Sequence, residues 1–319
     1  MKIAVVGAGG VGGYFAAALS KAGHEVKLLA RGAHRDAIRS HGLRVVDPDG
    51  EWTAEVDASD DPRALLPAEL AIVAVKSYSI PEIAPAVSAL AAAGAVVLPL
   101  LNGVEAGDAL AARGVPRASL LAGLVFVGVE KTGPGVITRK SRFQTIVLGE
   151  PGGGPSDRAE RVAQALRDAG ADASVSNEII LDLWRKFLFL TTFATAAGLS
   201  RAPIGPIREA PLGRLLLERA AREIGDVARA RGIDLPESEE REALVRLNAL
   251  EGGLTPSFLL DLERGGPTEL DVLTGAVSRY GRESGVETPI HDAATAAFGA
   301  AQGRKTTEAP RPAGSLPGF

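Results

Sequence analysis

The residues whose types and spacing are best suited to binding a ligand form the glycine-rich sequence Gly7-Ala8-Gly9-Gly10-Val11-Gly12. In a G-x-G-x-x-G sequence the first glycine permits a tight turn, the second lets backbone N–H groups approach a pyrophosphate, and the third lets a helix pack closely on a strand. The amino terminus of the helix that follows offers unpaired N–H groups and the positive end of its dipole to phosphate. We therefore predict that these six residues bind a dinucleotide. The alternative is an ordinary glycine-rich turn.

The end of the second predicted strand indicates which dinucleotide. A site for NAD or FAD usually places Asp or Glu there to bind the ribose hydroxyls. Here the strand Glu25–Leu29 is followed by Ala30 and Arg31, with no carboxylate after Glu25. A guanidinium forms paired, charge-assisted hydrogen bonds with phosphate, so Arg31 favours the 2′-phosphate of NADP(H). A solvated surface arginine is the alternative interpretation.

Two further polar residues follow predicted strands. Lys76 comes after the apolar run Leu70–Val75, and Asn102 comes after Ala95–Leu101. In an open parallel sheet, ligands bind beyond the carboxyl ends of the strands. Lys76 could therefore face the cofactor or an anionic substrate group, and Asn102 could hydrogen-bond the nicotinamide or a polar substrate. Each residue alone is also typical of a turn.

The second half of the chain adds a lysine on an apolar helical face. Lys186 shares this face with Phe189 and Leu190, three and four positions further on. Its ammonium either extends to water or lines a cleft, where desolvation would make it a better proton donor. The residues alone leave both interpretations open. Glu269 and Ser257 each open a predicted helix, which on physical grounds alone explains their presence.

The elements that must position these residues divide the chain in two. Lys2–Val6, Gly13–Lys21 and Glu25–Leu29 give strand, helix and strand, and strands continue to alternate with helices as far as Val175. We predict an α/β domain over residues 1–176. Helical patterns then replace the strands and predict an all-α domain over residues 177–305. Residues 306–319, rich in proline and glycine, are expected to form a loosely ordered tail.

Composition limits the classes of function. A chain of 319 residues suits two domains, and its net charge of −4 argues against a nucleic-acid partner. The absence of cysteine excludes disulfides and thiolate metal sites, and the four histidines are scattered, so no metal site is expected. Glycines interrupt the apolar amino-terminal run, which argues against a signal peptide. We expect a cytoplasmic protein with a small-molecule substrate and no membrane partner; a homodimer is one arrangement that the sequence allows.

With these residues in view, the chain resembles the ketopantoate reductases (2-dehydropantoate 2-reductases) from Met1 to about Gln302. The sequences that carry the resemblance are GAGGVG with Arg31, AVKSYS, LLNGVE, LWRKF and PTELD. The resemblance implies a Rossmann-type α/β amino-terminal domain with a second, all-α carboxyl-terminal domain, and NADPH as cofactor. It also implies the reduction of ketopantoate to pantoate in pantothenate biosynthesis.

The resemblance further implies a role for each residue. Lys186 would be the general acid that protonates the alkoxide formed when hydride reaches the keto carbon. Lys76 and Asn102 would position substrate and nicotinamide, Ser257 would bind substrate, and Glu269 would act in catalysis at the junction of cofactor and substrate.

One departure from the family bears on the substrate. Family members typically carry asparagines one and two turns after the catalytic lysine, where this chain has Leu190 and Ala194. Leucine cannot hydrogen-bond a substrate hydroxyl, so the pocket should be less polar on that face. Alternative hypotheses are a reductase of another branched or bulky 2-keto acid, a catalytically silent dinucleotide-binding regulator, and a two-domain dehydrogenase for a hydroxy acid or polyol phosphate.

Overall fold

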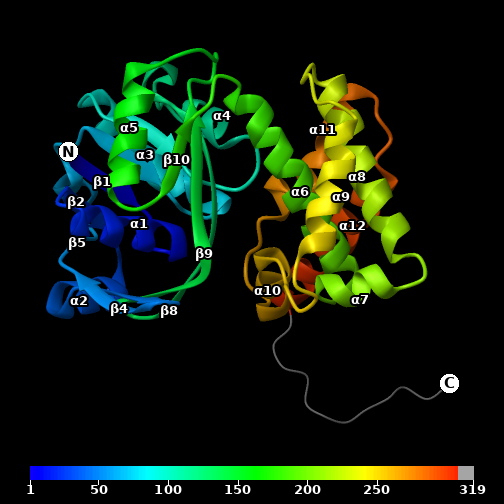
Figure 1. Cartoon of the computed structure of the whole chain (residues 1–319), viewed down its shortest axis with the longest axis horizontal. Coiled ribbons are helices and arrows are strands. Elements are labelled where there is room, and N and C mark those ends of the chain that lie inside the picture. Colours follow the sequence, from blue (N-terminus) through cyan, green and yellow to red (C-terminus); the bar gives the residue numbers. More distant parts are fainter. Residues whose placement is uncertain (308–319) are drawn as a thin grey trace, which may run out of the picture. The chain divides into compact units, whose positions relative to one another are not determined.

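The computed structural model describes residues 1–307 (Figure 1). Contacts between Cα atoms divide the chain into two units, Met1–Lys186 and Phe187 onward, and the division falls within helix α6 (Ile179–Ser200). The predicted domain boundary at Ser176 precedes this helix, whereas the contact-based division lies inside it, because one continuous helix contributes residues to both units. From residue 308 onward the predicted loose tail lies outside the described residues.

The first unit is built on a parallel sheet in which the strands have the order β5-β2-β1-β6-β7. Alternate residues of β1 face two different cores, since Ile3 and Val5 belong to one buried cluster and Ala4 and Val6 to another. Burial on both faces explains the apolar runs in the sequence. The strands are β1 (Lys2–Val6), β2 (Glu25–Leu29), β5 (Asp57–Ser59), β6 (Leu70–Val73) and β7 (Val96–Pro99).

A second sheet in the same unit has the order β10-β9-β3-β4, with β8 antiparallel to β9. The sequence Asp47-Pro48-Asp49-Gly50 predicts a tight turn, and in the structure it joins β3 and β4 as an antiparallel hairpin. The long strands β8 and β9 are drawn in green in Figure 1. The strands are β3 (Leu43–Asp47), β4 (Gly50–Ala54), β8 (Ala122–Gly133), β9 (Val136–Gly149) and β10 (Asp172–Val175).

Helix α1 (Gly10–Lys21) packs against both sheets. Its Phe15 and Leu19 share a buried cluster with Val5 of β1 and Ile146 of β9. This packing fixes the helix whose amino terminus carries the glycine sequence. The other helical elements of the unit are α2 (Gly32–His41), η1 (Pro62–Leu65), η2 (Ser77–Ser79), α3 (Ile80–Ala92), α4 (Ala106–Ala111), η3 (Arg117–Ser119) and α5 (Asp157–Asp168).

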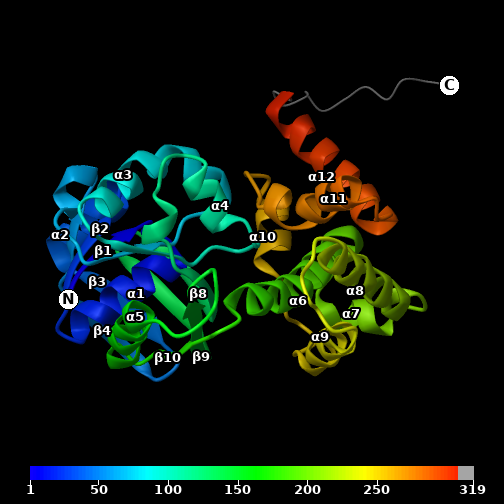
Figure 2. The ribbon, with the colours of Figure 1, turned by 90° about the horizontal axis from the view of Figure 1, so that it is seen from above.

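The described part of the second unit contains helices only, which confirms the predicted fold class (Figure 2). The sequence pattern of residues 207–231 predicts one helix, which is wrong as a single element, because the chain breaks between α7 and α8. Ala210 precedes Pro211 and adopts φ −65° and ψ 142°, the extended conformation that proline imposes on the residue before it. Beyond α6 the elements are α7 (Ile204–Glu209), α8 (Gly213–Ala230), α9 (Ser238–Ala249), α10 (Ser257–Arg264), η4 (Leu270–Val272), α11 (Thr274–Ser284) and α12 (Pro289–Thr307). Across the described chain, none of the helices combines the length and the apolar character needed to cross a membrane.

Candidate active site

Four of the predicted sites follow four neighbouring strands of the parallel sheet. Arg31 follows β2, the glycine sequence follows β1, Lys76 follows β6 and Asn102 follows β7. Because these strands are parallel, their carboxyl ends meet at one edge of the sheet. β2 and β6 lie on opposite sides of β1, so the connections leave in opposite directions at this point. Such a switch point is where open α/β sheets bind their ligands.

The glycines of the loop after β1 have different physical roles. Gly7 has φ +111°, and a Cβ there would lie 2.6 Å from the carbonyl oxygen of Ala74. A Cβ on Gly12 would lie 1.9 Å from the carbonyl oxygen of Gly7, so the turn and the first helical turn are in direct contact. A Cβ on Gly9 would meet no heavy atom within 4 Å. Gly7 and Gly12 therefore permit the packing, while Gly9 leaves an open face.

This open face fits the pyrophosphate of a dinucleotide. Gly9 is the N-cap of α1, and the first N–H groups of a helix have no acceptor within the helix itself. The first turn of α1, all of it described, contains no acidic residue that would offset the positive end of the dipole. At Gly9, therefore, a ligand can approach the backbone closely, and the helix terminus there favours an anion.

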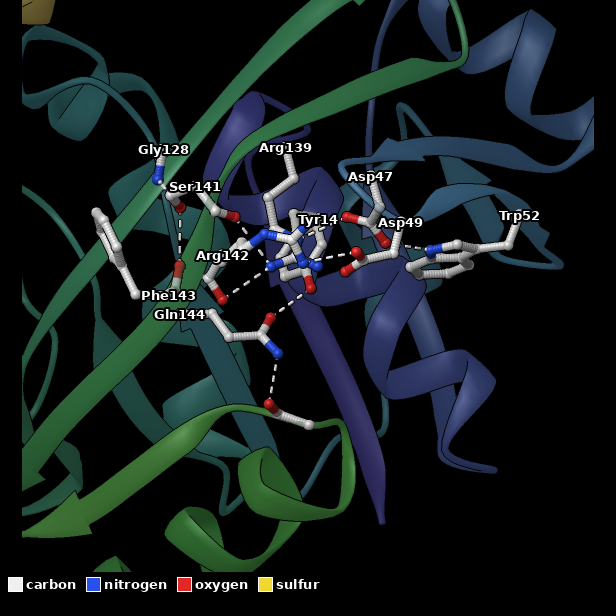
Figure 3. A network of polar contacts seen from close by, with 11 residues as sticks. Tyr14, Asp47, Asp49, Trp52, Gly128, Arg139, Ser141, Arg142, Phe143 and Gln144 are labelled. Atoms are coloured by element: carbon white, nitrogen blue, oxygen red, sulfur yellow. Dashed lines mark hydrogen bonds and ion pairs between the residues drawn. The ribbon is translucent and has the colours of Figure 1, made fainter. Parts of the chain in front are cut away.

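A polar network holds α1 against the second sheet (Figure 3). The Tyr14 hydroxyl donates to Oε1 of Gln144 on β9, and the Arg139 guanidinium lies 5.6 Å from the centre of the Tyr14 ring. Arg139 Nε donates to Oδ1 of Asp47 at 2.6 Å, and Trp52 Nε1 donates to Oδ2 of the same carboxylate at 2.5 Å. Sequence reasoning missed this network, because its members come from four separate elements.

Burial keeps the Tyr14 hydroxyl a donor. Burial raises the pKa of the phenol above its ordinary value, the Arg139 charge lowers it and the Asp47 charge raises it, with a net rise. The phenol therefore stays protonated at neutral pH. Tyr14 lies one turn after the start of α1, so its bond to β9 helps to hold the glycine loop in position.

Arg31 already has an acidic partner at the sheet edge. It is the N-cap of α2, and its Nη1 forms an ion pair with Oε1 of Glu82, in the first turn of α3. Both side chains are more than half exposed, at 56% and 57%. Arg35, one turn further along α2, is paired with Asp36 at 2.6 Å and with Asp60.

Lys186 and Asn102 are brought together, although they are far apart in the sequence. Lys186 Nζ donates to Oδ1 of Asn102 at 3.2 Å and lies 5.6 Å from the centre of the Phe126 ring. The lysine is only 7% exposed, which contradicts the interpretation of its ammonium as extending to bulk water. A buried ammonium held by an amide oxygen at the carboxyl edge of a parallel sheet can donate a proton and stabilise developing negative charge.

The other predicted site residues are Lys76, at the same sheet edge, and Ser257 and Glu269, in the second unit. Lys76 is half-buried immediately before η2. Ser257 is the exposed first residue of α10, and Glu269 is buried directly before η4. Thr268 Oγ1 accepts a hydrogen bond from the Leu270 N–H at 3.3 Å, a local side-chain bond that spans Glu269. Ser257 and Glu269 belong to the second unit, and their proposed roles beside Lys186 stay predictions.

The helical face that follows Lys186 is apolar. Leu190 and Ala194 lie four and eight residues further along α6, a spacing that keeps them on one face of the helix. Leu190 is half-buried and Ala194 is fully buried. The neighbouring Thr195 hydroxyl is 2.9 Å from that of Thr274, so its hydrogen-bonding capacity is directed to α11.

The first unit contains a cavity of about 350 Å3, lined in part by neighbours in the sequence of Asn102 and Lys186. Gly103 and Val104, which directly follow Asn102, contribute to its wall, and so does Leu183, one turn before Lys186. Most of the other residues around it are apolar. No pattern in the sequence indicates this cavity, because its wall comes from five separate segments.

Comparison with known proteins places the chain in a family. Sequence models described as "Ketopantoate reductase PanE/ApbA" and its "C terminal" match residues 3–153 and 178–302. A 2-dehydropantoate 2-reductase of Halobacterium salinarum is 31% identical over 91% of this chain and 95% of its own length. An uncharacterized oxidoreductase of Bacillus subtilis, YkpB, is 28% identical over 91% of this chain and 95% of its own length. The crystal structure of a PanE/ApbA family ketopantoate reductase from Ralstonia eutropha aligns with a TM-score of 0.88 and 29% identity, over 96% of this chain and all of its own. The chain therefore belongs to the ketopantoate reductase family of oxidoreductases.

Proposed function

We propose that the protein reduces a 2-keto acid to the 2-hydroxy acid with NADPH, and that ketopantoate, reduced to pantoate for pantothenate biosynthesis, is the first substrate to expect. Family membership supports the reaction class, and several relatives are named 2-dehydropantoate 2-reductase. The observation that carries the proposal is the hydrogen bond between the buried Lys186 ammonium and Asn102 at the carboxyl edge of the parallel sheet.

In the proposed reaction the protein supplies position, charge and a proton. A bound reduced nicotinamide would supply the hydride. Lys186 stabilises the negative charge that develops on the keto oxygen and transfers a proton to it. Asn102 Oδ1 accepts a hydrogen bond from the Lys186 ammonium, and so fixes the orientation of its N–H groups.

NADPH is the proposed cofactor because of the residue at the end of β2. The open face at Gly9 suits the pyrophosphate of either dinucleotide and does not distinguish them. Arg31 occupies the position at which an NAD site usually carries a carboxylate, and its guanidinium suits a 2′-phosphate.

A second candidate substrate class is a bulkier and less polar 2-keto acid. The observation in its favour is the apolar stripe of Leu190 and Ala194 on the helix that carries Lys186. Such side chains favour an apolar substrate group and give no hydrogen bond to the hydroxyl of ketopantoate.

The experiment is an NADPH-oxidation assay with the purified protein and a panel of 2-keto acids. The panel contains ketopantoate, 2-ketoisovalerate, 2-ketoisocaproate and phenylpyruvate, and each kcat/KM is measured. The highest value for ketopantoate supports the first substrate, and a higher value for the larger apolar acids supports the second class. Tight NADPH binding without turnover of any acid would contradict a reductase and favour a regulatory role.

A further inference from the structure

The carboxylate that is missing from the end of β2 is supplied by another element. Glu82, in the first turn of α3, reaches the Arg31 guanidinium from across the sheet edge. An acid at this edge commonly binds the ribose hydroxyls of NAD, and a base there binds the 2′-phosphate of NADP. The first unit therefore presents both groups, already paired with each other.

We propose that Glu82 sets the cofactor preference of this site. Its carboxylate competes with a 2′-phosphate for Arg31, and it accepts hydrogen bonds from the ribose hydroxyls of a dinucleotide that lacks this phosphate. The inference rests on the proposed dinucleotide-dependent function. It adds that the protein binds both NADPH and NADH, with a smaller preference for NADPH than Arg31 alone would give.

Because the Arg31–Glu82 ion pair is exposed, replacing Glu82 by a phosphate as the partner of Arg31 costs little free energy. Both side chains are more than half exposed, and exposed ion pairs contribute little to stability. A phosphate group carries close to two negative charges and binds a guanidinium through two parallel hydrogen bonds. Arg31 can therefore leave Glu82 for the phosphate. Glu82 then remains near a group of like charge, which weakens NADPH binding.

The neighbouring charges do not compensate for Glu82. Arg35 is the next cation along α2, and it is paired with both Asp36 and Asp60. The cluster thus contains two guanidinium groups and three carboxylates, so its net charge is negative. A site that relied on charge alone to select a 2′-phosphate would need the opposite balance.

The test measures binding of the adenosine end alone, independently of turnover. Calorimetric titrations of the full-length protein with adenosine 2′,5′-bisphosphate and with ADP are made for wild type, Glu82→Gln and Glu51→Gln. Glu51 is the matched control, because it pairs with Arg44 at 3.3 Å with similar exposure and its substitution changes the net charge equally. Glu82→Gln should bind the bisphosphate about twofold to fivefold more tightly and ADP about twofold more weakly. Glu51→Gln should change neither affinity.

Each outcome has a distinct meaning. Binding of both nucleotides with unchanged affinities in a folded Glu82→Gln variant overturns the role of Glu82 and leaves the proposed function in place. Equal changes in the Glu51→Gln variant also overturn it, because they would show a general charge effect. Failure of wild type to bind either nucleotide refutes the dinucleotide site itself and the proposed function with it.

Discussion

Gly9 offers the sharpest test of the proposed cofactor site, because substitution there should weaken NADPH binding without destabilising the fold. It adopts φ −75° and ψ −166°, which any residue can adopt, and a Cβ would meet no heavy atom within 4 Å. Replacing glycine by alanine at an N-cap should cost less than about 1 kcal/mol of unfolding free energy. The added methyl group would stand where the pyrophosphate approaches the backbone. Losing one charge-assisted hydrogen bond, about 1.5–3 kcal/mol, should raise the Kd for NADPH about 10- to 150-fold.

Gly12→Ala is the counterpart that should damage the fold. Its Cβ would lie 1.9 Å from the Gly7 carbonyl oxygen, whereas ordinary contacts begin at 3.4 Å, so the turn or helix α1 must move by about 1.5 Å. We expect a loss of about 1–3 kcal/mol in the free energy of unfolding, together with loss of NADPH binding.

Both variants are measured by urea unfolding and by fluorescence titration with NADPH. The reasoning predicts a wild-type unfolding midpoint with weakened binding for Gly9→Ala, and a lowered midpoint for Gly12→Ala. A Gly9→Ala protein that binds NADPH with the wild-type Kd would show that the pyrophosphate does not lie on this loop. A Gly12→Ala protein of unchanged stability would refute the packing argument.

Three further predictions follow from single side chains. Lys186→Met should lower kcat about 10²- to 10⁴-fold with an unchanged Kd for NADPH, and wild-type turnover would remove the assigned proton donor. Tyr14→Phe loses the hydrogen bond to Gln144 and should lower the free energy of unfolding by about 0.5–1.5 kcal/mol; an unchanged urea midpoint would count against the network. Burial and the Lys131 charge lower the pKa of His34 below 6.5, and a hydrogen bond with the Ala8 backbone opposes them with a smaller effect. The unfolded state therefore binds more protons than the folded state, and the free energy of unfolding should fall as the pH drops below about 6.5. His34→Gln should make that decline shallower, and identical pH profiles of stability would contradict the assignment.

Much of the first unit could be predicted from the sequence, because the relevant signals are local. Within about thirty residues, two apolar runs indicate the strands β1 and β2, and the glycines between them indicate the conformation of the turn. The turn at Asp47–Gly50 is likewise indicated by its own local sequence. The break between α7 and α8 was not predicted, although its cause, Pro211, is also local.

The partners of the site residues were decided by the tertiary structure. Asn102 and Lys186 are 84 positions apart, and they meet because β7 ends at the sheet edge to which α6 brings its lysine. Arg31 and Glu82 are 51 positions apart, and the sequence shows no carboxylate directly after β2 without indicating that Glu82 pairs with Arg31. The physical reason is that local patterns specify elements and turns through short-range sterics and hydrogen bonding. Which side chains face each other depends on the order of the strands and on how the helices pack over them.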